Sequence, residues 1–417
     1  MLNTLKNYFR YDFSLITKIL FSVFIVHYGS YLYLGQITTI NKITFGLYVI
    51  FIFLILINKL YLSELKIGLF KYQFLLLVFS SLFLYSFFLN RSNLNISWFL
   101  GDVMVFFGII FSMLLGHFFK LEIFNSDIIK RLCAILFVIL VLNVTISIFF
   151  IDEPRIRSVS RLIFLPSFFI YQMFKTKEKI YLYLTLICFL LSILSNTRYA
   201  FVVMLLMVLL YSIFFYRKNI YNLLSLKNIL TSVTLFIFII YILLQNNILQ
   251  QWSFYVLFTP ELMGNLGIIN VFLGRVFEVQ DAYSELIKNF NLFSIFFGNG
   301  FGASYEMNEL WNFYFQEYAH EGSISSENRR HVLHFGPARF FFRYGLVGIF
   351  LVLYILYINL KTLFTIYSKK TNDLELFFGI TLLMYLIRFP LQPIFNDIII
   401  LYCLSGMLNH RRFKNVN

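Results

Sequence analysis

The sequence predicts an all-α polytopic integral membrane protein with about twelve transmembrane helices and one large external loop between spans nine and ten. The chain has 417 residues, of which 60% are hydrophobic and 13% are charged, and its mean hydropathy is +0.79. Soluble domains need more polar surface than this composition supplies. Apolar runs of membrane-spanning length recur along the chain, and basic residues gather in alternate loops. Residues 1–417 are therefore expected to form a single membrane domain.

Twelve apolar segments approach the length of about 20 residues that a helix needs to cross the hydrocarbon core. The first continues as a full span without a small-residue cleavage site, so we expect no cleaved signal peptide. The segments lie near residues 16–34, 43–58, 68–89, 97–119, 131–151, 161–173, 180–196, 199–216, 229–245, 338–360, 374–390 and 393–409.

The basic residues predict how these spans are oriented. The net charge is +14, and 21 of the 34 lysines and arginines fall in the loops that face inward if the N-terminus is cytoplasmic. Cytoplasmic loops of membrane proteins carry such an excess. We therefore expect both termini in the cytoplasm. The charge reflects membrane topology, and no nucleic-acid partner is predicted.

The thirteen basic residues expected on the outer side are mostly arginines. They comprise eleven arginines and two lysines, whereas the inward-facing set has sixteen lysines and five arginines. The planar guanidinium of arginine binds phosphate and carboxylate groups through two parallel hydrogen bonds. The bias predicts an anion-binding outer face, to which Arg157 and Arg161 belong. Snorkelling of arginines at helix ends is the simpler alternative.

No metal, disulfide or cofactor site is predicted. The three cysteines, Cys133, Cys188 and Cys403, all fall inside predicted spans, where they are packing residues. No Asp-x-Asp pair or His–Cys cluster lies in the segments expected outside. Whatever chemistry this protein performs is therefore expected to rely on its own side chains.

The longest segment between spans, residues 246–337, is expected outside, and loops of that length are usually functional. Apolar residues recur at helical spacing between 276 and 290. This pattern predicts an amphipathic helix that lies along the membrane surface, with Arg275 at its start. The helix leads into the sequence GNGFG at residues 298–302, a turn that glycine makes easily.

A second constrained position is Arg198, within the sequence LSNTRYAF. Spans seven and eight share only about 37 residues, so the turn between them has almost no spare length. Arg198 should therefore lie at, or just beneath, the outer membrane surface. A charge at that depth is costly, and a functional role is the default hypothesis.

Three elements thus follow one another on the outer side: Arg198 in a tight turn, Arg275 ahead of GNGFG, and His334 ahead of GPARFFFRYGLVG. This order resembles the superfamily of O-antigen ligases and Wzy-type O-antigen polymerases. Members carry an arginine after a serine-containing turn, an arginine before G-x-G, and a histidine ahead of a G-x-x-G that opens a membrane helix. Here ten residues separate His334 from Gly345, which begins GLVG. The resemblance covers roughly a quarter of the chain.

The resemblance implies a glycosyltransferase of the bacterial inner membrane that acts at the periplasmic face on undecaprenyl-diphosphate-linked glycans in O-antigen or lipopolysaccharide biosynthesis. His334 would be the general base, since an imidazole with a pKa of roughly 6.5 accepts a proton near neutral pH. Arg198 and Arg275 would complete the catalytic set by stabilising the leaving diphosphate. The lipid-linked donor and acceptor and the bilayer are the expected partners, and a chain-length regulator protein is a further candidate.

Several residues near this set are candidates for substrate binding. His331 precedes His334 by one helical turn and is the rival base. Two arginines follow at the start of span ten, and two more lie between spans five and six. The candidate substrate-binding residues are Arg339, Arg343, His331, Arg157 and Arg161.

Two departures from the family pattern leave the choice of reaction open. Phe335 stands where Asn or Ser is frequent, and Arg343 where an acidic residue is common. We favour a polymerase, because short motifs in a divergent chain are typical of that branch; a ligase that transfers the polymer to lipid A-core is the alternative. A flippase is more remote, because its ionisable residues should run through the depth of the bundle. Asp102 is the clearest acid inside a predicted span.

Overall fold

The computed structural model describes residues 13–33, 38–62, 70–89, 95–118, 122–150, 163–194, 198–216, 267–288, 292–306, 329–330, 336–369, 374–389, 395 and 397–414. These residues are mostly helical. Among these described residues, two helices are long and apolar enough to cross a membrane, α5 (Ile96–Phe118) and α16 (Gly336–Lys369). The coarse prediction of a helical protein with membrane-type helices is therefore confirmed.

The elements follow the predicted order. The first part of the chain forms α2 (Phe13–Tyr33), α3 (Thr38–Leu62), α4 (Phe70–Leu89), α5, η1 (Glu122–Phe124), α6 (Ser126–Phe150), α7 (Phe164–Thr176), α8 (Lys179–Leu194) and α9 (Arg198–Phe215). The later part forms α13 (Gly267–Lys288), α14 (Leu292–Phe297), β1 (Tyr305–Glu306), β2 (Arg329–Arg330), α16, α17 (Leu374–Arg388) and α18 (Ile398–Lys414). Eleven of the twelve apolar segments coincide with helices, and the ninth, near 229–245, lies outside the described residues.

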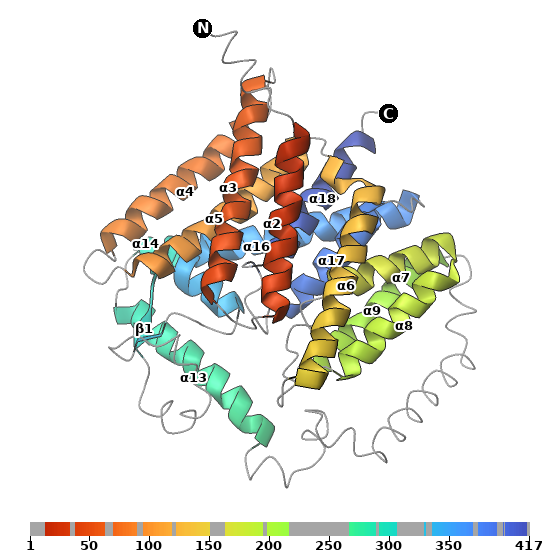
Figure 1. Cartoon of the computed structure of the whole chain (residues 1–417). Helices are drawn as coiled ribbons and strands as arrows, with labels where there is room; N and C mark the ends of the chain where they lie inside the picture. Colours follow the sequence, from red (N-terminus) through yellow and green to blue (C-terminus); the bar gives the residue numbers. More distant parts are fainter. Residues whose placement is uncertain are drawn as a thin grey trace.

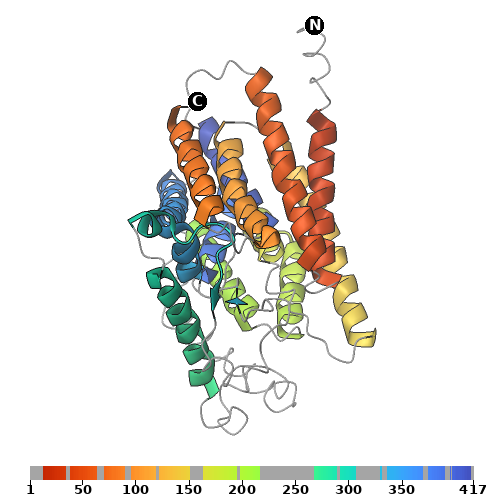
Figure 2. The same cartoon turned by 90° about the vertical axis from the view of Figure 1, so that its left-hand side faces the viewer.

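The first and the last described helix share an end of the bundle that lies away from α13. The beginning of α2 and the end of α18 lie at the same end of the bundle, and α13 lies at the opposite end (Figures 1 and 2). Side-chain caps help to fix where helices begin, because they satisfy N–H groups of the first turn. Asn95 Oδ1 accepts from the Trp98 N–H at 3.2 Å before α5, and Asp397 Oδ1 accepts from the Ile399 N–H at 3.0 Å before α18.

Small residues bring α5 and α18 into close contact. Gly108, Ser112 and Gly116 stand four residues apart and share one face of α5. A Cβ atom at Gly116 would come within 2.3 Å of the Ser405 carbonyl oxygen. The Ser405 hydroxyl donates to the Ser112 carbonyl at 2.9 Å. Small residues at this spacing are typical of helix pairs in membranes, where close backbone approach and hydrogen bonds replace the hydrophobic effect.

A neutral polar cluster joins three other helices. Ser167 on α7 places its Oγ 2.9 Å from the Tyr211 hydroxyl on α9 and 2.6 Å from Thr381 Oγ1 on α17. Thr381 also donates to the Phe377 carbonyl at 2.7 Å. We call Ser167, Tyr211 and Thr381 the hydroxyl cluster. All three are fully buried, and their mutual hydrogen bonds remove the cost of burying hydroxyl groups.

The amphipathic helix differs from its prediction in extent. It begins at Gly267, so Arg275 lies in its middle, because the apolar residues before Arg275 extend the helical pattern. It ends at Lys288, and the separate helix α14 leads to the glycines. Its apolar residues also divide between two faces: Tyr283 and Ile287 are exposed, whereas Leu286 is buried. The loop also contains a two-stranded ladder that the all-α prediction omitted.

Candidate functional site

The sequence GNGFG forms a tight turn, residues 298–302, which we call the glycine turn. It follows α14 directly, and the Gly298 N–H donates to the Ser294 carbonyl at 2.9 Å. Gly298, Gly300 and Gly302 have φ angles of 66°, 82° and 77°. Only glycine adopts this left-handed region without strain. The predicted turn is therefore confirmed.

The glycine turn is inserted into a break in α16. The backbone at Gly345 is non-helical, with φ 56° and ψ −148°. In an uninterrupted helix, the carbonyls just before this point would accept from N–H groups four residues later. The kink interrupts this series of helical hydrogen bonds. Asn299 N–H now donates to the Phe342 carbonyl at 2.7 Å, and Gly300 N–H donates to the Arg343 carbonyl at 3.0 Å.

The next two N–H groups of the glycine turn bind side chains of the helices opposite. The Phe301 N–H donates to Ser86 Oγ on α4 at 2.8 Å, and the Gly302 N–H donates to Asp102 Oδ2 on α5 at 2.9 Å. The Phe301 ring is fully buried and meets Tyr344 edge-on, with centroids 5.7 Å apart. Four successive N–H groups thus have acceptors, as buried backbone groups require.

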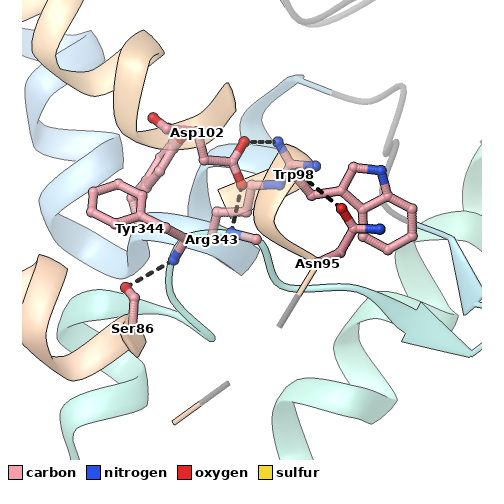
Figure 3. Close-up of polar contacts among 8 residues, drawn as sticks. Ser86, Asn95, Trp98, Asp102, Arg343 and Tyr344 are labelled. Atoms are coloured by element: carbon pink, nitrogen blue, oxygen red, sulfur yellow. Dashed lines mark hydrogen bonds and ion pairs between the residues drawn. The ribbon is translucent and has the colours of Figure 1, made fainter. Parts of the chain in front are cut away.

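An ion pair completes this junction (Figure 3). Arg343 Nη1 donates to Asp102 Oδ1, and the two side chains are 1% and 2% exposed. The pair connects α5 to α16 at the point where the glycine turn is inserted. Taking two charges out of water is costly, and the cost is offset only where the geometry is good and further hydrogen bonds are made. The Gly302 N–H supplies one such bond. We call Ser86, Asp102, the glycine turn and Arg343 the ionic joint.

A second arginine lies one helical turn before Arg343. Arg339 is 7% exposed, and the charges that act on it include those of Arg343 and Asp102. Among the residues that the structure describes, no hydrogen bond or ion pair reaches its guanidinium. Arg343, by contrast, is held by Asp102. The two arginines that the sequence placed together therefore differ in their surroundings.

A small second core lies beside the ionic joint. Ala282 and Leu286 of α13 pack with Ala303, Tyr305 and Phe342. The acids Glu278 and Asp281 are also buried on α13, at 0% and 7% exposure. Strand β1 pairs antiparallel with β2, so that Tyr305 faces Arg330 and Glu306 faces Arg329. This ladder joins the segment after the glycine turn to the residues that immediately precede His331.

The structure places some of the predicted site residues and leaves others outside its described ranges. Arg339 and Arg343 lie on α16 before its kink. Arg198 is the first residue of α9 and Arg275 lies within α13, and for these two the structure describes only the backbone. The predicted residues outside the described ranges are His331, His334, Arg157 and Arg161. Their predicted roles, like those of the four arginines above, stay predictions.

Sequence reasoning missed two members of the ionic joint. The sequence shows Asp102 as an acid within an apolar segment but predicts no partner for it, and it does not single out Ser86. An acid inside a span is a signal by itself, because such residues are rare and usually paired. A serine in a span carries no comparable signal, since it also bonds to its own helix, as Ser86 does with the Leu82 carbonyl.

The described residues form a helical protein in which two helices are long and apolar enough to cross a membrane, with a buried ionic joint between α4, α5, α16 and the glycine turn. No protein-family model, no curated protein and no solved structure matches the chain. Within the described part of the chain, no group of three or more His, Cys, Asp or Glu side chains is placed to hold a metal ion. Beside the Asp102–Arg343 pair, the site holds the buried guanidinium of Arg339.

Proposed function

We propose that this protein is a multi-pass protein of the bacterial inner membrane with about twelve spans, both termini in the cytoplasm and residues 246–337 in the periplasm. The charge distribution supports this topology, because 21 of 34 basic residues fall in the inward-facing loops. The positions of α2, α18 and α13 at the two ends of the bundle are compatible with it (Figure 1). Reporter fusions after Asn417 and near Gly322 test the topology, and an external C-terminal reporter would contradict it.

Within that membrane, we propose a metal-independent glycosyltransferase that polymerises undecaprenyl-diphosphate-linked oligosaccharide repeat units at the periplasmic face. One observation carries this proposal. Two of the three elements that resemble O-antigen polymerases and ligases are in direct contact, because the GNGFG turn bonds to α16 immediately before Gly345 of GLVG. They are 43 positions apart in sequence, counted between Asn299 and Phe342. A chance resemblance in scattered short motifs gives no reason for such contact.

The proposed reaction transfers a glycan from its lipid diphosphate to a sugar hydroxyl. The hydroxyl oxygen attacks the anomeric carbon of the donor, and the bond from that carbon to the diphosphate oxygen breaks. His334 takes the hydroxyl proton, and undecaprenyl diphosphate leaves with the bonding electrons. Arg198 and Arg275 stabilise the charge that develops on the diphosphate, where preorganised donors contribute most. His334 stands two residues before Gly336, the start of α16.

Gene deletion followed by examination of the surface glycan tests the proposed function. A polymerase predicts single repeat units on the lipid core after deletion. Long polymer stranded on undecaprenyl diphosphate would identify a ligase, and unflipped substrate would identify a flippase. An unchanged surface glycan would contradict all three.

Point variants test the assigned roles in transfer assays with purified lipid-linked substrate. His334→Ala should lose at least about a hundredfold in rate, while His331→Ala keeps a substantial fraction. Arg198→Lys and Arg275→Lys should lose roughly tenfold to a hundredfold, because lysine lacks the planar fork. Wild-type rates in both lysine variants would mean that these arginines contribute to membrane topology and not to diphosphate binding.

A further inference from the structure

Among the described residues, two buried arginines lie close together near the start of α16. Arg339 and Arg343 bring two guanidiniums, and Asp102 is the carboxylate that acts on both. Its Oδ1 is bound by Arg343 and its Oδ2 by the Gly302 N–H. Glu278 and Asp281 are buried on nearby α13, where they have interactions of their own, and the groups whose charges act on Arg339 include Arg343, Asp102, Tyr344 and Tyr305. Among these described groups, two guanidiniums therefore share one carboxylate.

Arg339 also stands at an unfavourable place in its helix. It is the fourth residue of α16, and the first turn of a helix carries partial positive charge from its unsatisfied N–H groups. Cations are normally avoided there, whereas anions are stabilised. A guanidinium that is more than nine-tenths buried at this position, beside a second arginine, needs a negative partner. Pro337 and Ala338, which directly precede it, are partly exposed, so the position lies near the surface.

We propose that Arg339 is the anion-binding residue of this site and takes a phosphate oxyanion, whereas Arg343 is a positioning residue held by Asp102. A guanidinium offers two parallel hydrogen bonds that match two phosphate oxygens. The ionic joint fixes the helix segment that carries Arg339, so the fork is presented in one orientation. Assigning the phosphate to the diphosphate of a lipid-linked donor rests on the proposed function, but the anion site itself does not.

Binding to the purified full-length protein in nanodiscs tests the site. One arm uses inorganic pyrophosphate in solution, and the other uses nanodiscs that contain undecaprenyl diphosphate. Arg339→Gln should weaken binding at least tenfold in whichever arm the wild type binds, and Arg339→Lys should fall between the two. Arg131→Gln removes an exposed arginine of α6 and is the matched control. It should leave binding unchanged.

The outcomes separate the anion site from the proposed reaction. If binding depends on Arg339 but the protein has no transfer activity, the proposed anion site stands and the proposed glycosyltransferase function is contradicted. Transfer at the wild-type rate by Arg339→Gln, with unchanged binding, overturns the anion site alone. Failure of the wild type to bind either probe also overturns it. If Arg339→Gln does not fold, Arg339→Lys decides, because it keeps the charge, and equal binding by that variant excludes a bidentate arginine contact.

Discussion

The ionic joint and the hydroxyl cluster are both buried polar connections between helices, but they are built differently. The hydroxyl cluster joins α7, α9 and α17 through neutral groups that satisfy one another. The ionic joint connects α4, α5 and α16 to a turn of the long loop, and it uses a full ion pair. Neutral hydroxyls are sufficient to connect buried helices. A buried charge pair beside a second buried arginine is a costlier arrangement, and such residues are expected to have a role beyond packing.

The largest effect is expected where the glycine turn meets α16. In Gly345→Ala, a side chain would occupy a backbone conformation that is nearly exclusive to glycine. Its Cβ would also stand 2.4 Å from the Phe296 carbonyl carbon. Strain and overpacking together should cost roughly 3–6 kcal/mol, so we expect little folded protein by size-exclusion chromatography in detergent.

Gly101→Ala is the matched control for that substitution. Gly101 lies within α5, one residue before Asp102, and a Cβ there meets no atom within 4 Å. Alanine should be neutral or should stabilise the helix by up to about 1 kcal/mol. Equal losses from both substitutions would mean that the kink at Gly345 is not what holds the glycine turn.

Separating the two charges of the ionic joint should have the next largest effect. Asp102→Leu leaves Arg343 buried without its carboxylate, which should cost about 3–5 kcal/mol. Asp102→Leu combined with Arg343→Met removes both charges. The double variant then loses chiefly the acceptor of the Gly302 N–H, about 1–3 kcal/mol. Equilibrium unfolding in mixed micelles should therefore show the double variant to be more stable than the single one, and the reverse order would contradict a desolvated ion pair.

The hydroxyl cluster should respond more weakly. Ser167→Ala removes the group shared by Tyr211 and Thr381, but no charge is stranded and Thr381 keeps its bond to the Phe377 carbonyl. The expected loss is about 1 kcal/mol, that of a neutral buried hydrogen bond. The same unfolding measurement applies. A loss as large as that of Asp102→Leu would erase the distinction between the two connections.

The helices were predictable from the sequence because apolar length and basic loops leave few alternatives for a chain of this composition. Most predicted segments match helices, and the turn at 298–302 was predicted from its glycines. The kink at Gly345 was not predicted. A glycine in an apolar segment is compatible with either close helix packing or a break in the helix. Gly116 is an example of close packing, because it contacts α18 within the regular helix α5.

The candidate site was predictable only in part, for a physical reason. Sequence reasoning grouped Arg339 and Arg343 because they are one helical turn apart, and it gave them one role. Their difference depends on Asp102, which is 241 positions from Arg343 in the chain. Long-range pairing of this kind leaves no local pattern. An acid in an apolar span indicates that a partner exists, but the fold is needed to identify it.

The smallest effect is expected for the exposed ion pairs of α13, which sharpen the contrast with the buried one. Lys288 Nζ lies 3.9 Å from Glu285 Oε2 and 3.8 Å from Glu306 Oε2, and its side chain is 62% exposed. Water and salt screen such contacts, and holding a long side chain in place costs entropy. Lys288→Met should therefore change the unfolding free energy by less than about 1 kcal/mol, and the change should shrink as salt is raised. A larger, salt-independent loss would mean that α13 is held to β1 by this lysine and not by the packing of Ala282 and Leu286 around Tyr305. The contrast between these exposed contacts and the buried Asp102–Arg343 pair would then be lost.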